Sequence, residues 1–148
     1  MSGKQYLPKS ASFGLSYSKF TLSNMVLVRT GRYIDAESVY LNASVTVKNE
    51  GGQAGSEVVQ LYVSLPEIGV TTPKLQLRGF AKARLIKPGG STKLTINLDK
   101  YAFSFWDESQ NAWKLPAGKY GIHLGTSSDN LVLHDTFELP RSFIWNGL

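Results

Sequence analysis

Cysteine is absent from the 148-residue chain. The protein can therefore form no disulfide bond, bind no metal through thiolates and use no cysteine nucleophile. The sequence also lacks any apolar run close to the roughly 18 residues that a membrane-spanning helix needs. Its polar, basic start, MSGKQYLPKSAS, lacks the apolar stretch of a secretory signal. These absences predict a soluble protein with one compact core, which either stays inside the cell or is a piece of something longer.

Acidic residues are absent from one long stretch. The chain has 16 lysines and arginines against 11 aspartates and glutamates, a formal net charge of +5, and no acidic residue lies between Glu67 and Asp99. This stretch is either a solvated strand face or a surface that attracts polyanionic glycan, oxidised lignin or nucleic acid. Nucleic-acid-binding surfaces interleave aromatic residues with cations, whereas here only Phe80 does so and we expect it to point inward. The sequence thus argues against a nucleic-acid partner and offers four candidate ligand-binding cations: Lys74, Arg78, Lys82 and Arg84.

Sustained helical spacing is absent too, because apolar residues recur at every second position. Residues 38–49 place five apolar side chains on one face and polar ones on the other, and the pattern returns in residues 57–66, 92–99, 119–125 and 131–139. The weaker alternation of residues 74–85, with Gly79 inside, indicates a bulge or a bend between two short strands. About seven short strands predict an all-β fold, an immunoglobulin-like β-sandwich of two antiparallel sheets.

The segment LPAGKY, residues 115–120, has the form of a tyrosine corner. In immunoglobulin-like sandwiches such a tyrosine folds its hydroxyl back to the backbone a few residues upstream and so fixes the corner. We therefore expect Pro116 and Gly118 to form a turn and Tyr120 to be buried with its hydroxyl bonded. This interpretation is favoured over an active-site loop that displays Trp113.

Catalytic and metal-binding constellations are missing as well. The alternation places His123 and His134 at outward or edge positions as isolated residues, whereas a zinc or copper site needs three or four converging ligands. A glycosidase needs two carboxylates at a defined separation, one of them with a raised pKa. Asp107 and Glu108 lie in a polar hairpin turn, WDESQN, where we expect both to be solvated and to titrate normally. With no GxSxG elbow either, the sequence predicts no metal, no cofactor and no catalysis by the isolated domain.

Three tryptophans are candidate ligand-binding residues of another kind: Trp106, Trp113 and Trp145. Exposed together, their rings could stack on sugar rings or on phenolic groups. The favoured interpretation for Trp106 and Trp113 is that they face each other across a hairpin and cover one end of the core. Trp145 lies in an apolar tail, so we expect it to be exposed or to dock onto a neighbouring domain. Asn42 begins a tentative N-glycosylation sequon, NAS, on the outward face of its strand.

Four blocks of sequence, taken in order, resemble a known family. They are FGLSYSKF at 13–20, VTVKNEGGQAGSEVVQLYVSLP at 45–66, KLQLRGFAKARLIKPGGSTKLTINLD at 74–99 and FSFWDESQNAWKLPAGKYGIHLGTSSDNL at 103–131. Over residues 13–139 the chain resembles the C-terminal fibronectin type III-like domain of glycoside hydrolase family 3 β-glucosidases and β-xylosidases. The resemblance implies a two-sheet sandwich that follows the catalytic barrel and α/β domains of a secreted or periplasmic enzyme. It also implies that the nucleophile and the acid/base carboxylate lie in those preceding domains.

The resemblance divides the chain into three predicted parts: a disordered tail over residues 1–12, the domain over 13–139 and a C-terminal tail over 140–148. We predict a non-catalytic accessory domain whose partners are the catalytic domains of the parent glycosidase. One alternative is an autonomous module that adsorbs to polysaccharide or lignin through exposed aromatic and basic residues. A third interpretation is a protein-binding sandwich of the adhesion type. No membrane partner is expected.

Overall fold

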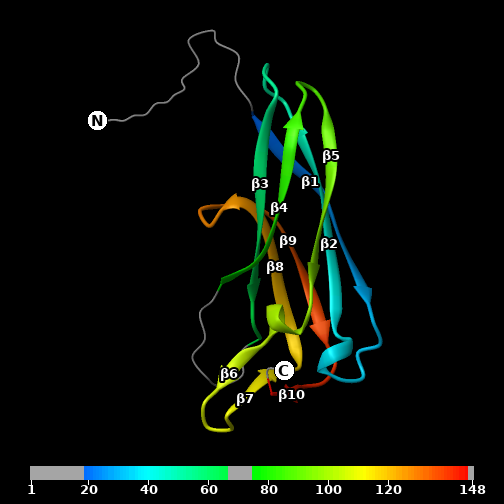
Figure 1. Ribbon diagram of the computed structural model, residues 1–148, viewed down its shortest axis with the longest axis vertical. Helices are drawn as coiled ribbons and strands as arrows, with labels where there is room; N and C mark the ends of the chain where they lie inside the picture. The colour runs from blue at the N-terminus through cyan, green and yellow to red at the C-terminus, as the bar shows by residue number, and fades with distance from the viewer. Residues whose placement is uncertain (1–18, 67–74, 147–148) are drawn as a thin grey trace, which may run out of the picture.

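The computed structural model describes residues 19–66 and 75–146, which form ten strands and two short 3-10 helices (Figure 1). The strands are β1 (Phe20–Thr30), β2 (Tyr40–Asn49), β3 (Gly55–Ser64), β4 (Gln76–Ile86), β5 (Ser91–Leu98), β6 (Phe105–Asp107), β7 (Ala112–Leu115), β8 (Gly118–Ser127), β9 (Asn130–Leu139) and β10 (Phe143–Trp145). The helices are η1 (Ala36–Ser38) and η2 (Lys100–Phe103). The tail predicted over residues 1–12 lies outside the described residues.

Seven of the ten strands form the two layers of the sandwich. One sheet has the order β1-β2-β5 and the other β4-β3-β8-β9, and all neighbouring strands are antiparallel. The remaining strands form a small third sheet, β10-β7-β6, at the lower end in Figure 1. The predicted all-β sandwich is confirmed, with ten strands rather than about seven. Strands β6, β7 and β10 span only three or four residues each, which is too short for an alternating pattern to show in the sequence. The 11-residue β1 is a further strand that the alternation did not predict.

The side chains that the alternation predicts fill the space between the sheets. The inward residues of the central strands β2, β3 and β8 are each at most 1% exposed: Leu41, Ala43, Val45, Val47, Val59, Leu61, Val63, Tyr120, Ile122 and Leu124. One residue expected to face outward, Ser44, is buried instead at 8% exposure. The neighbouring strand β1 has a register shift between Ser23 and Val26, and the Ser44 hydroxyl donates to the carbonyl of Val26 at 3.5 Å.

Strand β4 departs from the expectation in one respect and follows it in another. The predicted bulge is present, as a register shift between the pairs Leu61–Gly79 and Tyr62–Leu77, but β4 is one continuous strand. The prediction that Phe80 points inward is wrong, because its side chain is 70% exposed. The small residues of β4 face the interior instead, where a Cβ on Gly79 would lie 2.7 Å from the Cγ2 of Ile96. No ring fits on that side, so Phe80 points outward.

The predicted tyrosine corner is present. Tyr120 is 0% exposed and its hydroxyl donates to the carbonyl oxygen of Pro116, four residues upstream. Burial raises the pKa of the Tyr120 hydroxyl. The ring packs edge-on against Phe103 at a centroid distance of 5.3 Å, and the turn between Pro116 and Tyr120 uses Gly118 at a φ of 130°, a backbone conformation that favours glycine. The segment 115–120 is therefore a structural corner rather than a catalytic loop.

Replacing Tyr120 with phenylalanine is expected to lower the free energy of unfolding by about 1 to 3 kcal/mol, because the buried Pro116 carbonyl loses its hydrogen-bond donor. Urea denaturation of the 148-residue chain measures the change. Tyr40→Phe is the matched control: Tyr40 is 45% exposed, so this substitution should change the free energy by no more than about 0.5 kcal/mol. Equal effects of the two substitutions would contradict the corner.

Candidate interaction surface

Four aromatic residues meet where the small third sheet joins the sandwich: Tyr101, Trp106, Trp113 and Trp145. Trp106 and Trp113 are partners in the β6–β7 ladder, with ring centroids 5.6 Å apart and edge-to-face, as the hairpin interpretation predicts. Trp113 stacks on Trp145 at 5.2 Å and an interplanar angle of 9°. Tyr101 packs edge-on against Trp145 at 4.8 Å. The cluster covers one end of the core and leaves only Trp106 and Tyr101 substantially exposed, at 42% and 49%.

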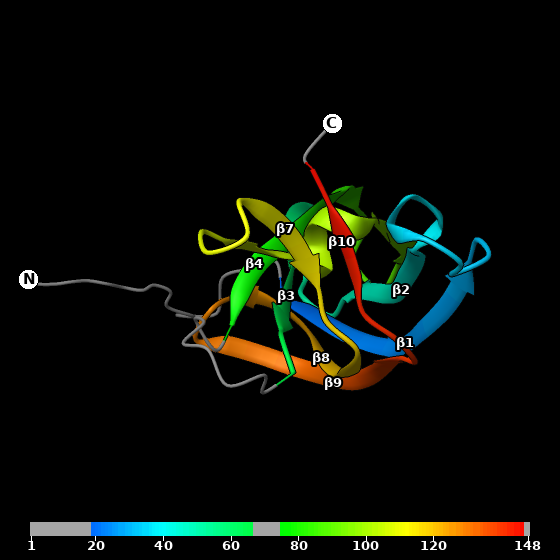
Figure 2. The same ribbon diagram turned by 90° about the horizontal axis from the view of Figure 1, so that it is seen from below.

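Trp145 is not the exposed ring that the sequence predicts. Its side chain is 6% exposed, and its indole nitrogen donates to the Ser104 hydroxyl at 3.0 Å. The Lys100 Nζ lies 4.3 Å from the centre of the ring. The segment predicted as a C-terminal tail, residues 140–148, holds strand β10, which pairs with β7 and lies beside it in Figure 2. Trp145 is therefore inaccessible for stacking on a ligand.

The Asp107 carboxylate is bonded in the hairpin rather than freely solvated. It accepts from the Ser109 backbone N–H at 2.9 Å and from the Ser109 hydroxyl at 2.6 Å, and it pairs with the Lys114 Nζ at 3.0 Å. The hydrogen bond from Ser109, followed by that from Lys114, holds the pKa of Asp107 below its ordinary value. The expectation that this carboxyl titrates normally is wrong, and the shift is opposite to the raised pKa that a glycosidase acid needs.

We expect the Asp107 carboxyl group to titrate below the ordinary aspartate pKa of 3.8. Because the folded-state pKa is lowered, the group stabilises the hairpin above its unfolded-state pKa, and this stabilisation is lost as the pH falls through the folded-state value. Carboxyl-detected NMR titration of the chain measures the midpoint. Ser109→Ala should raise the midpoint, since it removes the hydroxyl that donates to the Asp107 carboxylate. A midpoint that does not respond to this substitution would contradict the assignment.

The two histidines, predicted as isolated, are neighbours. His123 of β8 and His134 of β9 are directly paired across the ladder, with near-parallel rings 5.6 Å apart. Burial, followed by repulsion from His134, lowers the pKa of His123. Within the described residues no group of three or more His, Cys, Asp or Glu side chains converges. The pairing depends on the β8–β9 register, which single-strand alternation does not specify.

The tentative cations lie along β4, except Lys74, which falls outside the described residues. Lys82 and Arg84 are exposed and point outward on the same face as Phe80. Arg78 sits at the bulge, half-buried, and its Nη2 donates to the Gln76 side chain. Its Nε is buried with no hydrogen-bond partner in the described part of the chain, and burial lowers the pKa of Arg78. Arg78 therefore retains an unused donor.

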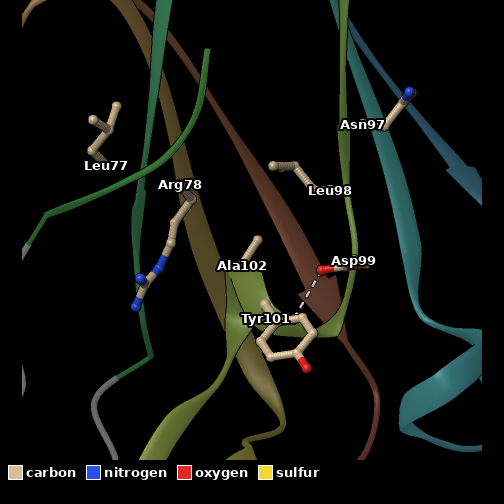
Figure 3. Close-up of a pocket in the computed structure, with 7 residues that line it drawn as sticks. All are labelled: Leu77, Arg78, Asn97, Leu98, Asp99, Tyr101 and Ala102. Atoms are coloured by element: carbon tan, nitrogen blue, oxygen red, sulfur yellow. Dashed lines mark hydrogen bonds between the residues drawn. The ribbon is translucent and has the colours of Figure 1, made fainter. Parts of the chain in front are cut away.

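Beside Arg78 lies a hollow of about 250 Å³ between β4 and the corner formed by β5 and η2 (Figure 3). Its lining residues are Leu77, Arg78, Asn97, Leu98, Asp99, Tyr101 and Ala102. The Asp99 carboxylate begins η2 and accepts from the Tyr101 backbone N–H at 3.0 Å. The wall thus combines a guanidinium, an amide, a carboxylate and a half-exposed ring. It can receive a polar side chain or a hydroxylated group.

Asn42 occupies the centre of the sheet β1-β2-β5. Its register partners are Val28 on one side and Asn97 on the other, and its side chain is half-buried on the outward face. Glycosylation at this position stays a prediction.

Comparison with known proteins identifies the domain type. Residues 57–128 match the model of the fibronectin type III-like domain. The chain is 42% identical over 135 residues to a probable β-glucosidase H of Emericella nidulans, covering 91% of this chain and 16% of that protein. It superposes on β-glucosidase from Kluyveromyces marxianus with a TM-score of 0.76 and 36% identity, over 92% of this chain and 16% of that one.

A bacterial structure gives the same result. The GH3 β-glucosidase of Bifidobacterium adolescentis matches with a TM-score of 0.75 and 35% identity, over 86% of this chain and 18% of that one. The chain spans about a sixth of the length of the curated relatives that it matches. No helix in the described ranges is long and apolar enough to cross a membrane. The chain therefore contains a fibronectin type III-like domain, of the kind found in glycoside hydrolase family 3 β-glucosidases.

Proposed function

We propose that the chain is a non-catalytic accessory domain of a β-glucosidase-type glycoside hydrolase, which stabilises the enzyme by packing against its catalytic domains. The observation that carries the proposal is the pattern of coverage: 91% of this chain matches only 16% of a β-glucosidase. A domain that makes up about a sixth of an enzyme has the remaining polypeptide as its partner. The parent enzyme acts outside the cytoplasm, as the family resemblance implies.

The side chains of the domain fit a role in packing against the catalytic domains better than a role in catalysis. Its interior is filled by apolar side chains, and Asp107 is held ionised by Ser109 and Lys114. No specific observation favours autonomous adsorption to polysaccharide or lignin, because Trp145 is buried and Trp113 is covered on one face by it. The reaction and the glucoside substrate then belong to the rest of the enzyme.

The test uses β-glucosidase H of Emericella nidulans in three forms: intact, with the residues matched by this chain removed, and with this chain in their place. We call the third form the chimera. Removing the domain is expected to shorten the half-life of aryl-β-glucosidase activity at elevated temperature at least tenfold, and the chimera is expected to recover it. The KM, measured before heating, should be the same in all three forms. Equal half-lives with and without the domain would contradict the proposal, as would glucoside hydrolysis by the 148-residue chain alone.

A further inference from the structure

Exposed apolar side chains concentrate on one edge of the sandwich. Of the twelve large hydrophobic residues exposed in the described part of the chain, four lie at or within β4: Leu75, Leu77, Phe80 and Leu85. Phe80 and Leu85 are the most exposed of all twelve, at 70% and 75%. Strand β9, the opposite edge of the same sheet, has only Val132 in that set. Grouped exposed apolar residues mark interaction sites, whereas scattered ones are ordinary.

The backbone of β4 is also unpaired on one side. β4 ends the sheet β4-β3-β8-β9, so its only ladder partner in the described ranges is β3. A long, apolar edge strand is an aggregation hazard unless it is covered or blocked by charge. Leu85 adds a local feature, since its φ of 46° is a conformation that leucine seldom adopts and its side chain contributes nothing to the core. These features are those of a surface that another part of the enzyme covers.

The charge on β4 indicates what kind of surface covers it. Lys82 and Arg84 lie between Phe80 and Leu85, and no acidic residue lies on β4 or between it and Asp99. The ion pairs of the described residues join Lys100 with Glu37 and Lys114 with Asp107. Neither Lys82 nor Arg84 forms an ion pair within the described residues. The Arg78 Nε adds a buried donor without a described partner. A complementary surface presents apolar side chains bordered by carboxylates.

We infer that the outward side of β4, formed by Leu77, Phe80, Lys82, Arg84 and Leu85 and called here the β4 face, is the docking surface for the rest of the same polypeptide. This inference rests on the proposed function. About five-sixths of the length of the relatives lies outside the region matched by this chain and is available as the partner. The charge of the β4 face selects a partner surface that bears carboxylates. A second copy of the domain fits less well, because pairing two β4 faces would bring Lys82 and Arg84 of both copies together.

The first measurement is substitution in the chimera. Phe80→Ser together with Leu85→Ser is expected to shorten the thermal half-life of activity at least tenfold, as removal of the whole domain does. The matched control, Val28→Ser together with Val132→Ser, removes exposed apolar side chains from β1 and β9 and should change the half-life less than twofold. In the isolated chain, both pairs should leave the melting temperature within about 2 °C, since exposed residues contribute little to the core.

The second measurement needs no substitution, so it tests the inference even if the variant with Phe80→Ser and Leu85→Ser unfolds. Carbodiimide couples amines to touching carboxylates, so Lys82 of the chimera is expected to cross-link to an aspartate or glutamate outside the domain, identified by peptide mass spectrometry. Lys48, exposed on β2 of the other sheet, should not. Cross-links from Lys48 alone, or a Lys82 cross-link between two copies, would overturn the inference while the proposed function stands. If removing the domain leaves the half-life unchanged, the proposed function itself fails.

Discussion

Replacing Phe103 with alanine is expected to lower the free energy of unfolding by about 3 to 5 kcal/mol. Phe103 is 0% exposed and ends η2, the short helix between β5 and the small third sheet. Its ring lies 5.3 Å from that of Tyr120 and 5.1 Å from that of Phe137, so it joins the tyrosine corner to β9. The loss combines the transfer free energy of the ring with the cavity left between two sheets that cannot collapse. It is a large part of the about 5 to 15 kcal/mol that stabilises a typical domain.

Denaturant titration of the isolated chain measures this loss. Phe80→Ala deletes the same atoms from a ring that is 70% exposed, and it should change the free energy of unfolding by no more than about 0.5 kcal/mol. The two substitutions remove the same atoms, so a difference between their effects on stability reports the difference in burial between Phe103 and Phe80. If Phe80→Ala destabilised the isolated chain as much as Phe103→Ala, the assignment of inside and outside on β4 would be wrong.

Replacing Trp145 with alanine is expected to destabilise the chain by about 3 kcal/mol or more. The substitution removes a 6% exposed ring, its stacking on Trp113 at 5.2 Å and its hydrogen bond to Ser104 at 3.0 Å. It also leaves the nearly buried Lys100 without the ring face beneath its ammonium group. Strand β10 should then detach from β7. Thermal unfolding gives the stability change, and amide exchange at Phe143 and Ile144 reports the detachment.

Trp106→Ala is the comparison for Trp145. Trp106 belongs to the same cluster but is 42% exposed, so its loss should cost about 1 kcal/mol, the scale of one aromatic pair beyond the little area it buries. If Trp106→Ala were the more damaging substitution, or if Trp145→Ala left the stability unchanged, Trp145 would be the free binding ring that its position in the sequence indicates.

Alternation predicts six of the seven strands of the two main sheets, because these strands are eight to eleven residues long and bury one face. It misses β1, where the register shift between Ser23 and Val26 interrupts the pattern. Tyr120 was predictable for a further reason, since its corner needs only a local turn and one hydroxyl. Strand β10 was not predictable, because three residues show no period and their burial depends on β7. Phe80 was misplaced since aromatic side chains usually point inward, whereas here small residues, Gly79 among them, fit against Ile96.

The candidate surface was partly visible in the sequence. The stretch around Arg78, Lys82 and Arg84 has no acidic residue, so the positive charge of β4 can be predicted from the composition alone. Its apolar side chains gain meaning only when β4 is known to be an edge strand, which is set by the sheet order. The burial of the Arg78 Nε without a hydrogen-bond partner in the described part of the chain could not be predicted either, because it depends on the bulge that β4 forms against β3. One feature of the sequence does indicate the orientation of β4. From Gly79 to Arg84 small and large side chains alternate, so that the small ones share one face and the large ones the other.

The most direct test of a role in contact is hydrogen–deuterium exchange of this chain, alone and within the chimera. Proximity to the catalytic domains should slow amide exchange over one continuous surface, with β4 slowed most because its outward face is covered. The strands of the core, already protected, should change little. Identical exchange at every described strand in the two settings would show that the domain touches nothing in the enzyme, and would contradict the account.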